Sequence, residues 1–386
     1  MEINDILFHK GENRKKYYNA VVPPIIQSSN FVFDSVDEMR NAISDEMNHH
    51  IYTRGNNPTV EILRKKIAAL EHAEDAIVTS SGSSAISIAV MSNVSAGDHI
   101  ICVNKPYAWT YKLITILLAR FGVEHTFVDG SDIYNIKKAI RPNTKLLYLE
   151  SPNSLTFELQ DLKACAKLAK ANNITTIIDN SHCSPIFQNP IDFGIDLVIH
   201  SGTKYLNGHS DVLIGTICGS KTLIKNIFVN EFMTLGVNIS PHDAALVIRG
   251  LRTLPLRLHR SDESAKKIVT WLEKHPKIKK VIYPFSNNFT QQELAKKQMK
   301  GNGGLFTIEL NTDNKEAVYR FTNAISKFLI AVSWGGYESL MIPSITFHDM
   351  DGMPDSPIPW TYVRLYVGLE DPEYLITDLA QALEKV

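Results

Sequence analysis

A single lysine, Lys204, follows an apolar run in the segment IHSGTKYLNG and is preceded by small hydroxylated residues. Burying an ammonium group is costly unless it is paired or chemically used, so this lysine is a candidate for a reactive amine. Ser201 and Thr203 stand just before it. The segment therefore indicates an amine with a chemical role beside two hydroxyl donors.

A carboxylate and a turn of small residues extend this set. Asp179 ends the apolar run ITTIID, and the turn SSGSSAI, residues 80–86, opens onto a helical stretch. Backbone N–H groups at a helix start suit a phosphate, although a serine cap on the helix is the alternative interpretation. Asp179 could likewise cap a turn. The turn is not a P-loop, because no Lys-Ser/Thr pair follows at the required spacing.

Taken together, the three features match the needs of pyridoxal 5'-phosphate (PLP). This cofactor requires a lysine for its covalent bond, a carboxylate against its pyridine nitrogen, and N–H and O–H donors for its phosphate. An ionised carboxylate keeps the ring nitrogen protonated, which lets the ring accept the electrons of a carbanion. We therefore predict a PLP site.

The elements that must position these groups alternate along the chain. Short apolar runs such as AIVTS, HIICVN, EHTFVD, KLLYLES and ITTIIDNS are separated by helical stretches. This alternation predicts an α/β fold with a mostly parallel central sheet sandwiched by helices. In such sheets the chemistry lies in the loops that follow the carboxyl ends of the strands.

Changes in the pattern of predicted helices and strands along the chain divide it into three regions. Residues 1–56 are poor in helical periodicity and are expected to form an extended arm that contacts a neighbouring subunit. Residues 57–250 form the predicted PLP-binding domain, which begins with a helix over residues 57–73 whose N-terminal turn contains Pro58. Residues 251–386 predict a smaller C-terminal α+β domain.

Composition argues against several classes of protein. Forty basic against forty-one acidic side chains leave a net charge of −1, so neither nucleic acid nor a membrane surface is an expected partner. No secretory signal and no run of about 18 apolar residues occurs. The four scattered cysteines are typical of reduced thiols, which predicts a cytoplasmic location. The spacings of His182, Cys183, His200 and His209 fit no common zinc pattern, so no metal is predicted.

Seven segments, in order, resemble the Cys/Met-metabolism family of fold-type I PLP enzymes over nearly the whole chain. They are YTRGNNPT, SSGSSAI, LESPNSLTFELQDL, IIDNSH, HSGTKYLNGHSDVLIG, SWGGYESL and YVRLYVGLED. The resemblance implies the fold of fold-type I PLP-dependent transferases, PLP as cofactor and a small sulfur amino acid as substrate.

The resemblance also implies roles in holding the cofactor. Lys204 is the covalent attachment point and the catalytic amine, Tyr107 stacks on the ring and takes part in catalysis, and Asp179 pairs with the ring nitrogen. The remaining implied contacts are with the phosphate, and they come from the backbone of Gly82 and Ser83, the hydroxyls of Ser201 and Thr203, and Tyr52 and Arg54 of a neighbouring subunit. A homo-oligomer is therefore expected, as a tetramer built from two dimers.

For the substrate, the resemblance implies that Arg364 forms a two-pronged pair with the α-carboxylate, a task suited to its planar guanidinium. Ser333, Trp334 and Tyr52 are expected to contact the substrate as well.

Two segments resemble the cystathionine β-lyase members of the family. They are SWGGYESL, which contains Trp334, and ESPNSLTFELQD, in which Ser154 stands where γ-acting relatives carry asparagine. They imply β-elimination of cystathionine to homocysteine, pyruvate and ammonia, a transsulfuration reaction of methionine biosynthesis.

Other segments leave the reaction open. YTRGNNPT and GTKYLNGHSDV look more like γ-acting members. A cystathionine γ-lyase, a γ-synthase or an O-acylhomoserine sulfhydrylase is therefore the alternative. A non-catalytic PLP-fold binding protein would be marked by loss of Lys204, Asp179 or Arg364, and all three are present.

Overall fold

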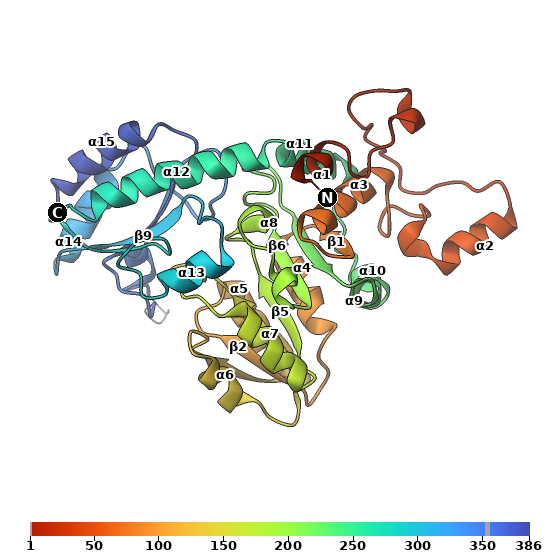
Figure 1. Ribbon diagram of the computed structural model, residues 1–386, viewed down its shortest axis with the longest axis horizontal. Coiled ribbons are helices and arrows are strands. Elements are labelled where there is room, and N and C mark those ends of the chain that lie inside the picture. The colour runs from red at the N-terminus through yellow and green to blue at the C-terminus, as the bar shows by residue number, and fades with distance from the viewer. Residues whose placement is uncertain (1, 352–355) are drawn as a thin grey trace. The chain divides into compact units, whose positions relative to one another are not determined.

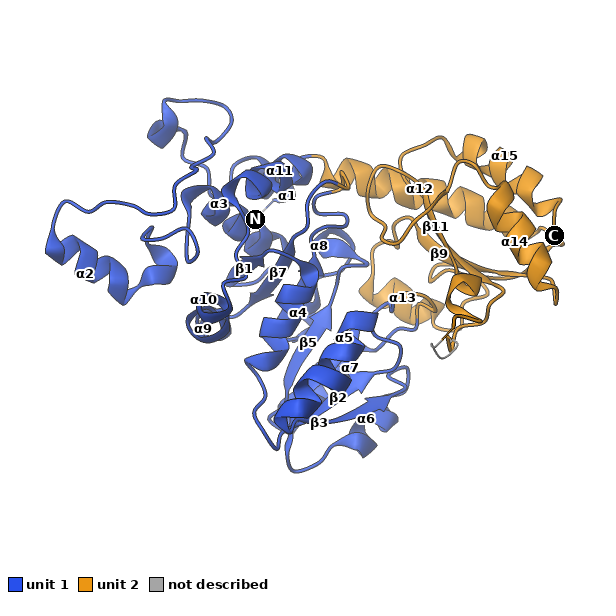
Figure 2. Ribbon diagram, turned by 180° about the vertical axis from the view of Figure 1, so that it is seen from behind, with its two compact units in different colours: residues 1–153, 158–207, 211–252 blue, residues 154–157, 208–210, 253–386 orange. Residues whose placement is uncertain are grey.

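The computed structural model describes residues 2–351 and 356–386, and Figure 1 shows its helices and strands along the chain. The chain divides into two compact units, which Figure 2 shows in different colours. Unit 1 contains residues 1–153, 158–207 and 211–252, and unit 2 contains residues 154–157, 208–210 and 253–386. The predicted functional boundaries after residues 56 and 250 stay predictions.

Unit 1 is built on a seven-stranded sheet with the strand order β1-β7-β6-β5-β4-β2-β3. Its strands are β1 (Asp75–Thr79), β2 (His99–Val103), β3 (Glu124–Val128), β4 (Thr144–Glu150), β5 (Thr175–Asp179), β6 (Leu197–Ser201) and β7 (Gly215–Gly219). The strands β3, β2, β4, β5 and β6, adjacent in that order, pair in parallel. The strand β7 is antiparallel to its neighbours β1 and β6. The predicted α/β fold with a mostly parallel central sheet is confirmed.

The helices of unit 1 connect and cover these strands. They are α1 (Ile3–Phe8), α2 (Val36–Ser44), α3 (Pro58–Leu70), α4 (Gly82–Met91), α5 (Ala108–Lys112), α6 (Ile133–Ala139), α7 (Leu162–Ala171), α8 (Ser184–Phe187), α9 (Lys221–Ile227), α10 (Met233–Leu235) and α11 (Pro241–Leu251). As predicted, Pro58 opens a helix, since its fixed φ suits the first helical position and its missing N–H is not needed there. The side chain of Asn57 caps the same helix by accepting a hydrogen bond from the Thr59 N–H.

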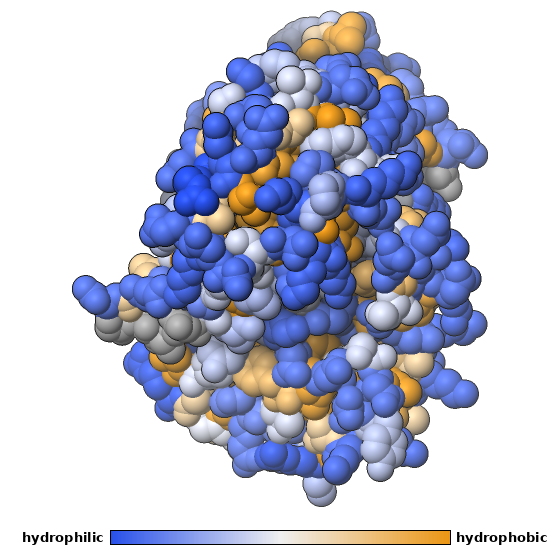
Figure 3. All heavy atoms as spheres, turned by 90° about the vertical axis from the view of Figure 1, so that its left-hand side faces the viewer, coloured by the Kyte–Doolittle hydropathy of each residue, from blue (hydrophilic) through white to orange (hydrophobic). Residues whose placement is uncertain are grey.

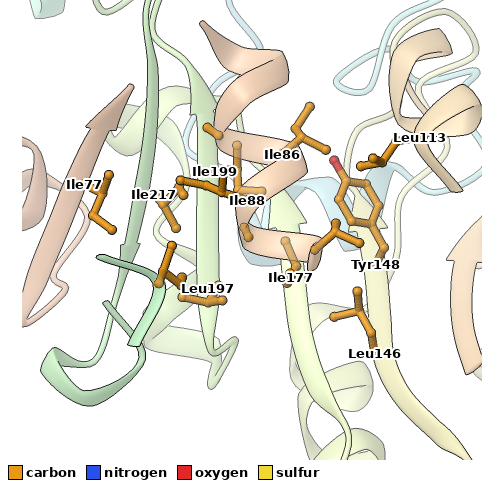
Figure 4. Close-up of a cluster of buried hydrophobic side chains, with 14 of the residues drawn as sticks. Ile77, Ile86, Ile88, Leu113, Leu146, Tyr148, Ile177, Leu197, Ile199 and Ile217 are labelled. Atoms are coloured by element: carbon orange, nitrogen blue, oxygen red, sulfur yellow. The ribbon is translucent and has the colours of Figure 1, made fainter. Parts of the chain in front are cut away.

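The core of unit 1 lies between the sheet and α4. Alternate strand residues point to one face of a sheet, so a run such as TTIID presents Ile177 and Asp179 on the same face. Figure 4 shows isoleucines of β1, β5, β6 and β7 gathered around Ile86 and Ile88 of α4. Burying these side chains holds α4 against the sheet and thereby places its first turn at the end of β6.

Residues 1–56, the predicted arm, contain the two helices α1 and α2. The helix α2 is mostly exposed and is capped locally: the Ser35 hydroxyl accepts from the Glu38 N–H, and the Glu38 carboxylate accepts from the N–H of Asp34, which precedes the cap. The helix α1 is held by a distant residue, because the buried Lys66 ammonium donates to the carbonyls of Ile6 and Leu7. The predicted contact of this arm with a neighbouring subunit stays a prediction.

Unit 2 has a five-stranded sheet with the order β10-β11-β12-β9-β8. Its strands are β8 (Ile278–Ile282), β9 (Leu305–Leu310), β10 (Leu329–Ile330), β11 (Leu340–Pro343) and β12 (Tyr362–Tyr366), and its helices are α12 (Leu254–Leu272), α13 (Gln292–Gln298), α14 (Lys315–Ala324) and α15 (Pro372–Leu383). A second apolar core, which includes Phe306, Phe321 and Leu379, lies within this unit. The predicted smaller α+β part is present.

Hydrophilic side chains cover most of the molecular face in Figure 3, and hydrophobic side chains occur there in small groups. Among residues 2–351 and 356–386, no helix combines the length and the apolar character that crossing a membrane requires.

Candidate active site

Three polar residues end neighbouring strands at the same edge of the unit 1 sheet. Glu150 ends β4, Asp179 ends β5 and Ser201 ends β6. The strands are parallel, and their register sets Glu150 opposite Asp179 and Asp179 opposite Ile199. This edge is where the chemistry of such a sheet is expected, because the carboxyl ends of the strands meet there.

Asp179 is held by a chain of hydrogen bonds that reaches β6. Its Oδ1 accepts from the Ser181 N–H at 2.9 Å and from the Ser181 hydroxyl at 2.5 Å. The Ser181 hydroxyl oxygen accepts from the Ser201 N–H at 2.6 Å. Ser181 therefore links the carboxylate to the strand end that carries the predicted phosphate-binding residues.

Burial and nearby charges act on the Asp179 carboxyl in opposite directions. Burial raises the pKa of Asp179 above its ordinary value, whereas the hydrogen bonds from Ser181 and the charges of His200 and Lys204 lower it. Lys204 thus lies close enough to Asp179 for its charge to act on this carboxyl, and its predicted role as the catalytic amine stays a prediction. A protonated ring nitrogen against Asp179 would add a further positive charge and favour the ionised carboxylate, so this environment fits PLP.

The first turn of α4 lies against the end of β6. A Cβ added to Gly82 would lie only 2.8 Å from the Ser201 Cβ, so only glycine allows this close approach. Ser81 caps the helix by accepting from the Ser84 N–H, and helix geometry leaves the N–H groups of Gly82 and Ser83 without an intrahelical acceptor. A cap and a phosphate cradle are therefore compatible in this turn, and together with Ser201 they fit a phosphate.

Thr203, another predicted phosphate ligand, has a structural use as well. Its hydroxyl accepts from the Ile214 N–H at 3.0 Å and lies 3.3 Å from the Ile214 carbonyl. These contacts tie the segment that carries Lys204 to the strand that follows it. The predicted phosphate contact of Thr203 stays a prediction.

Tyr107 is positioned by a carboxylate that the sequence did not single out. The Tyr107 N–H, at the start of α5, donates to Glu150 Oε2 at 2.7 Å, and the Tyr107 side chain is 39% exposed. Glu150 is buried at the end of β4. The signal that could have identified Glu150 is the one that identified Asp179, a carboxylate closing an apolar strand.

Tyr52 and Arg54 lie in the arm rather than at the strand edge. Both are exposed, and the Arg54 guanidinium lies 5.5 Å from the centre of the Tyr52 ring. Tyr52 forms an isolated backbone bridge with Asn30. Their predicted contact with the phosphate of a neighbouring subunit stays a prediction.

Three of the predicted substrate residues, Arg364, Ser333 and Trp334, belong to unit 2, whereas Tyr52 belongs to unit 1. Arg364 lies on β12 and is 8% exposed, and its two terminal nitrogens donate to the carbonyls of Ser154 and Ser333 at 3.2 and 3.3 Å. Ser333 has the left-handed φ of 83°, which turns the chain just before Trp334. Two backbone carbonyls thus orient the fork of Arg364, and the structure brings Arg364 and Ser333 together.

The buried histidine His200 has a structural partner. Its Nε2 lies 2.6 Å from Glu71 Oε1, and both side chains are almost fully buried. Within residues 2–351 and 356–386, no three His, Cys, Asp or Glu side chains gather as a group able to hold a metal ion.

Comparison with known proteins supports the same cofactor. Residues 4–384 match the family model described as Cys/Met metabolism PLP-dependent enzyme. The chain belongs to this family. Since the match covers almost the whole chain, the Cys/Met metabolism enzyme uses PLP, and the donor groups at the strand edge of unit 1 fit that cofactor.

Individual relatives of this Cys/Met metabolism enzyme act on sulfur amino acids, as their names state. It is 40% identical to an L-methionine gamma-lyase of Treponema denticola over 98% of this chain and 96% of that protein. It is 36% identical to a cystathionine gamma-lyase of Bacillus subtilis over the full length of both chains.

A solved structure of metB from Corynebacterium glutamicum superimposes with a TM-score of 0.93 at 34% identity. The match covers 100% of this chain and 98% of that one. Together with the family match, this likeness confirms that the enzyme has the fold-type I architecture.

Proposed function

We propose that this enzyme is a PLP-dependent carbon–sulfur lyase, and that it cleaves cystathionine by β-elimination. The observation that carries the lyase proposal is the gathering of these groups at one edge of the sheet: Asp179 ends β5, Ser201 ends the neighbouring strand β6, and Lys204 follows closely after Ser201. An amine and a ring-nitrogen partner in one site are what PLP chemistry at the α-carbon requires.

The proposed steps use residues of this chain. When bound, PLP supplies an electron sink for the carbanion at the α-carbon. Lys204 holds the cofactor and then removes the substrate α-proton through its neutral Nζ. Asp179 keeps a proton on the ring nitrogen, Arg364 binds the α-carboxylate, and Lys204 or Tyr107 delivers a proton to the departing thiolate. In balance, cystathionine and water give homocysteine, pyruvate and ammonia.

The choice of β-elimination rests on the segments around Ser154 and Trp334. Both flank Arg364: the carbonyl of Ser154 accepts from its guanidinium, and Trp334 follows Ser333, whose carbonyl also accepts from it. Residues that resemble the β-lyase pattern therefore surround the group assigned to the substrate carboxylate. This placement supports a role for them in choosing the reaction.

A γ-elimination is the second candidate, and the relatives favour it. The Treponema denticola and Bacillus subtilis proteins are both named gamma-lyases. On this alternative, cystathionine and water give cysteine, 2-oxobutyrate and ammonia, and methionine and water give methanethiol, 2-oxobutyrate and ammonia. The γ-synthase and O-acylhomoserine sulfhydrylase reactions are further alternatives to β-elimination.

The proposal includes an oligomer in which the arm packs on a second copy. Several large apolar side chains of the arm are exposed in the single chain, including Val21, Val22, Val32, Val36 and Ile43. Exposed apolar groups gathered on one segment of the chain are typical of an interface. A tetramer of two dimers and a cytoplasmic location complete the proposal.

Identification of the keto acid tests the function. Purified enzyme with PLP is given cystathionine or methionine, and the keto acid and the thiol are identified by mass spectrometry, with Lys204→Ala as the control. Pyruvate with homocysteine supports β-elimination, whereas 2-oxobutyrate with cysteine or methanethiol moves the assignment to a γ-lyase. If neither substrate releases a thiol, the lyase proposal fails, and acylated homoserine with a thiol then tests the replacement reactions.

A further inference from the structure

A buried carboxylate, Glu71, contacts both strand ends that carry the predicted cofactor residues. It caps the C-terminal end of α3 and is fully buried. Its Oε1 accepts from Asn180 Nδ2 at 2.9 Å and lies 2.6 Å from His200 Nε2. Asn180 directly follows Asp179, and His200 directly precedes Ser201. One oxygen atom therefore joins the ends of β5 and β6.

This junction lies on the face of the sheet opposite to Asp179. Asp179 stands opposite Ile199 in the register of β5 and β6, and Ile199 belongs to the core against α4. Successive strand residues alternate between faces, so the His200 side chain points to the other face, where Glu71 receives it. Glu71 thus acts from behind the sheet and does not occupy the space of the cofactor.

The position of Glu71 is unfavourable without these partners. A buried carboxylate loses its hydration, and the negative end of the α3 dipole adds to the penalty. Three donors offset this, since Asn189 Nδ2 also lies 3.4 Å from Oε2. The contact with a carboxylate assigns the Nε2 proton to His200. The same contacts that stabilise Glu71 therefore fix where the two strand ends lie.

We infer that Glu71 is a positioning residue for the cofactor. Through His200 and Asn180 it holds the ends of β5 and β6 in the register that presents Asp179 to the ring nitrogen and Ser201 to the phosphate. The hydrogen bonds from the Ser201 N–H to the Ser181 hydroxyl, and from that hydroxyl to Asp179, carry the constraint between the strands. The inference rests on the cofactor roles assigned to Asp179 and Ser201 in the proposed function.

Two substitutions at one position separate positioning from packing. In His200→Gln the side-chain amide nitrogen can take the place of Nε2 and still donate to Glu71. In His200→Phe the ring volume is kept but the donor is lost. If His200 serves only to fill space, His200→Phe should bind PLP more tightly than His200→Gln. The inference predicts the reverse order.

The experiment measures the dissociation constant of PLP by fluorescence titration of each apoprotein, after circular dichroism has confirmed its fold. We expect His200→Gln to stay within about twofold of wild type. We expect His200→Phe and Glu71→Leu to bind PLP roughly tenfold more weakly or worse, the scale on which loss of an outer hydrogen-bond partner weakens a metal site. Glu71→Leu removes both acceptor oxygens at similar volume, whereas a glutamine would keep an amide oxygen able to accept from both Asn180 and His200.

Asp196→Asn is the matched control. Asp196 joins the same two strands at their opposite ends, where its Oδ2 accepts from the Thr176 N–H and hydroxyl. Asp196→Asn should lower the thermal midpoint of the apoprotein and keep its PLP affinity within about twofold of wild type. Equal losses of PLP affinity in Asp196→Asn and Glu71→Leu would overturn the inference, as would tight PLP binding by His200→Phe. Because PLP affinity is measured without substrate, failure of the proposed lyase reaction would leave this comparison intact.

Discussion

The Glu150 carboxylate accepts a hydrogen bond from the Tyr107 N–H at 2.7 Å and stands opposite Asp179 in the sheet. The loop that carries the predicted stacking ring is therefore tied to the strand beside the ring-nitrogen partner. Hydrogen bonds to charged groups contribute about 1.5–3 kcal/mol, so this tie is strong enough to set the position of the loop.

Removing the Glu150 carboxylate should release the Tyr107 loop from its position while the fold is retained. We expect Glu150→Leu to lower kcat/KM by about tenfold or more, consistent with loss of one such hydrogen bond. Glu150→Gln keeps an oxygen at the same place and should retain most of the activity. Steady-state kinetics on the two variants checks this, and equal activity in both would show that Glu150 does not act through Tyr107.

The covalent role of Lys204 can be tested directly. After borohydride reduction of the wild-type holoenzyme, the peptide spanning residue 204 should carry the mass of the reduced cofactor. Lys204→Ala should lack this mass and lose activity by about 10²- to 10⁴-fold, since it loses its acid–base group. An unmodified wild-type peptide would remove the basis of the proposed function.

Gly82→Ala should weaken PLP binding through a steric effect. The new Cβ would lie 2.8 Å from the Ser201 Cβ and 2.9 Å from its hydroxyl oxygen, so the start of α4 or the end of β6 must move. Overpacking of this kind costs roughly 1–3 kcal/mol, and part of it should appear as reduced PLP affinity in a titration.

Ser83→Ala, at the next position in the same turn, is the control for Gly82→Ala. Ser83→Ala keeps the backbone N–H assigned to the phosphate and should bind PLP nearly as well as wild type. Weak binding by Ser83→Ala would assign the phosphate contact to the hydroxyl instead of the backbone.

Arg364→Lys should impair substrate binding and spare the cofactor. A lysine ammonium cannot reproduce the planar two-pronged contact that the carbonyls of Ser154 and Ser333 pre-orient. We expect KM to rise by about 10- to 100-fold, as for loss of a hydrogen bond to a charged group, with an unchanged dissociation constant for PLP. Comparable loss of substrate and PLP binding would contradict the assignment.

Acid should selectively weaken the attachment of the arm to α3. Burial alone would raise the pKa of Glu61, but hydrogen bonds and charges from His50 and Lys65 outweigh it and lower the pKa to about 2. A carboxyl with a depressed folded-state pKa stabilises the fold above its ordinary pKa, 4.5, and this contribution is lost as the pH falls towards 2. The difference in thermal midpoint between wild type and Glu61→Gln should therefore be largest above pH 4.5 and shrink below it.

Thermal scans at several pH values check this expectation. His50→Gln should reduce the same difference at pH 5, because it weakens one partner of Glu61. A difference that stays constant between pH 5 and pH 3 would show that Glu61 is not ionically coupled to the arm.

Candidate site residues could be predicted from the sequence where the chemistry allows only one or two residue types. Asp179 stands out because it closes an apolar strand and Lys204 because it follows one closely, and the alternation of strands and helices places both at one edge of a sheet. The helices of the arm were harder to predict, because α1 is stabilised by Lys66 from a distant helix and α2 is short, mostly exposed and capped locally. The reaction type is harder still, since β- and γ-elimination use the same amine and carboxylate.

By itself the sequence determined the cofactor chemistry, the family and the order of elements, because these follow from residue types and local periodicity. Only the tertiary structure decided which groups support the site. Glu71 reaches His200 from 129 positions away, Glu150 reaches Tyr107 from 43, and the Ser181 hydroxyl meets the Ser201 N–H from 20. Local patterns carry no record of such pairings, because the sheet register and helix packing that create them depend on the whole of unit 1.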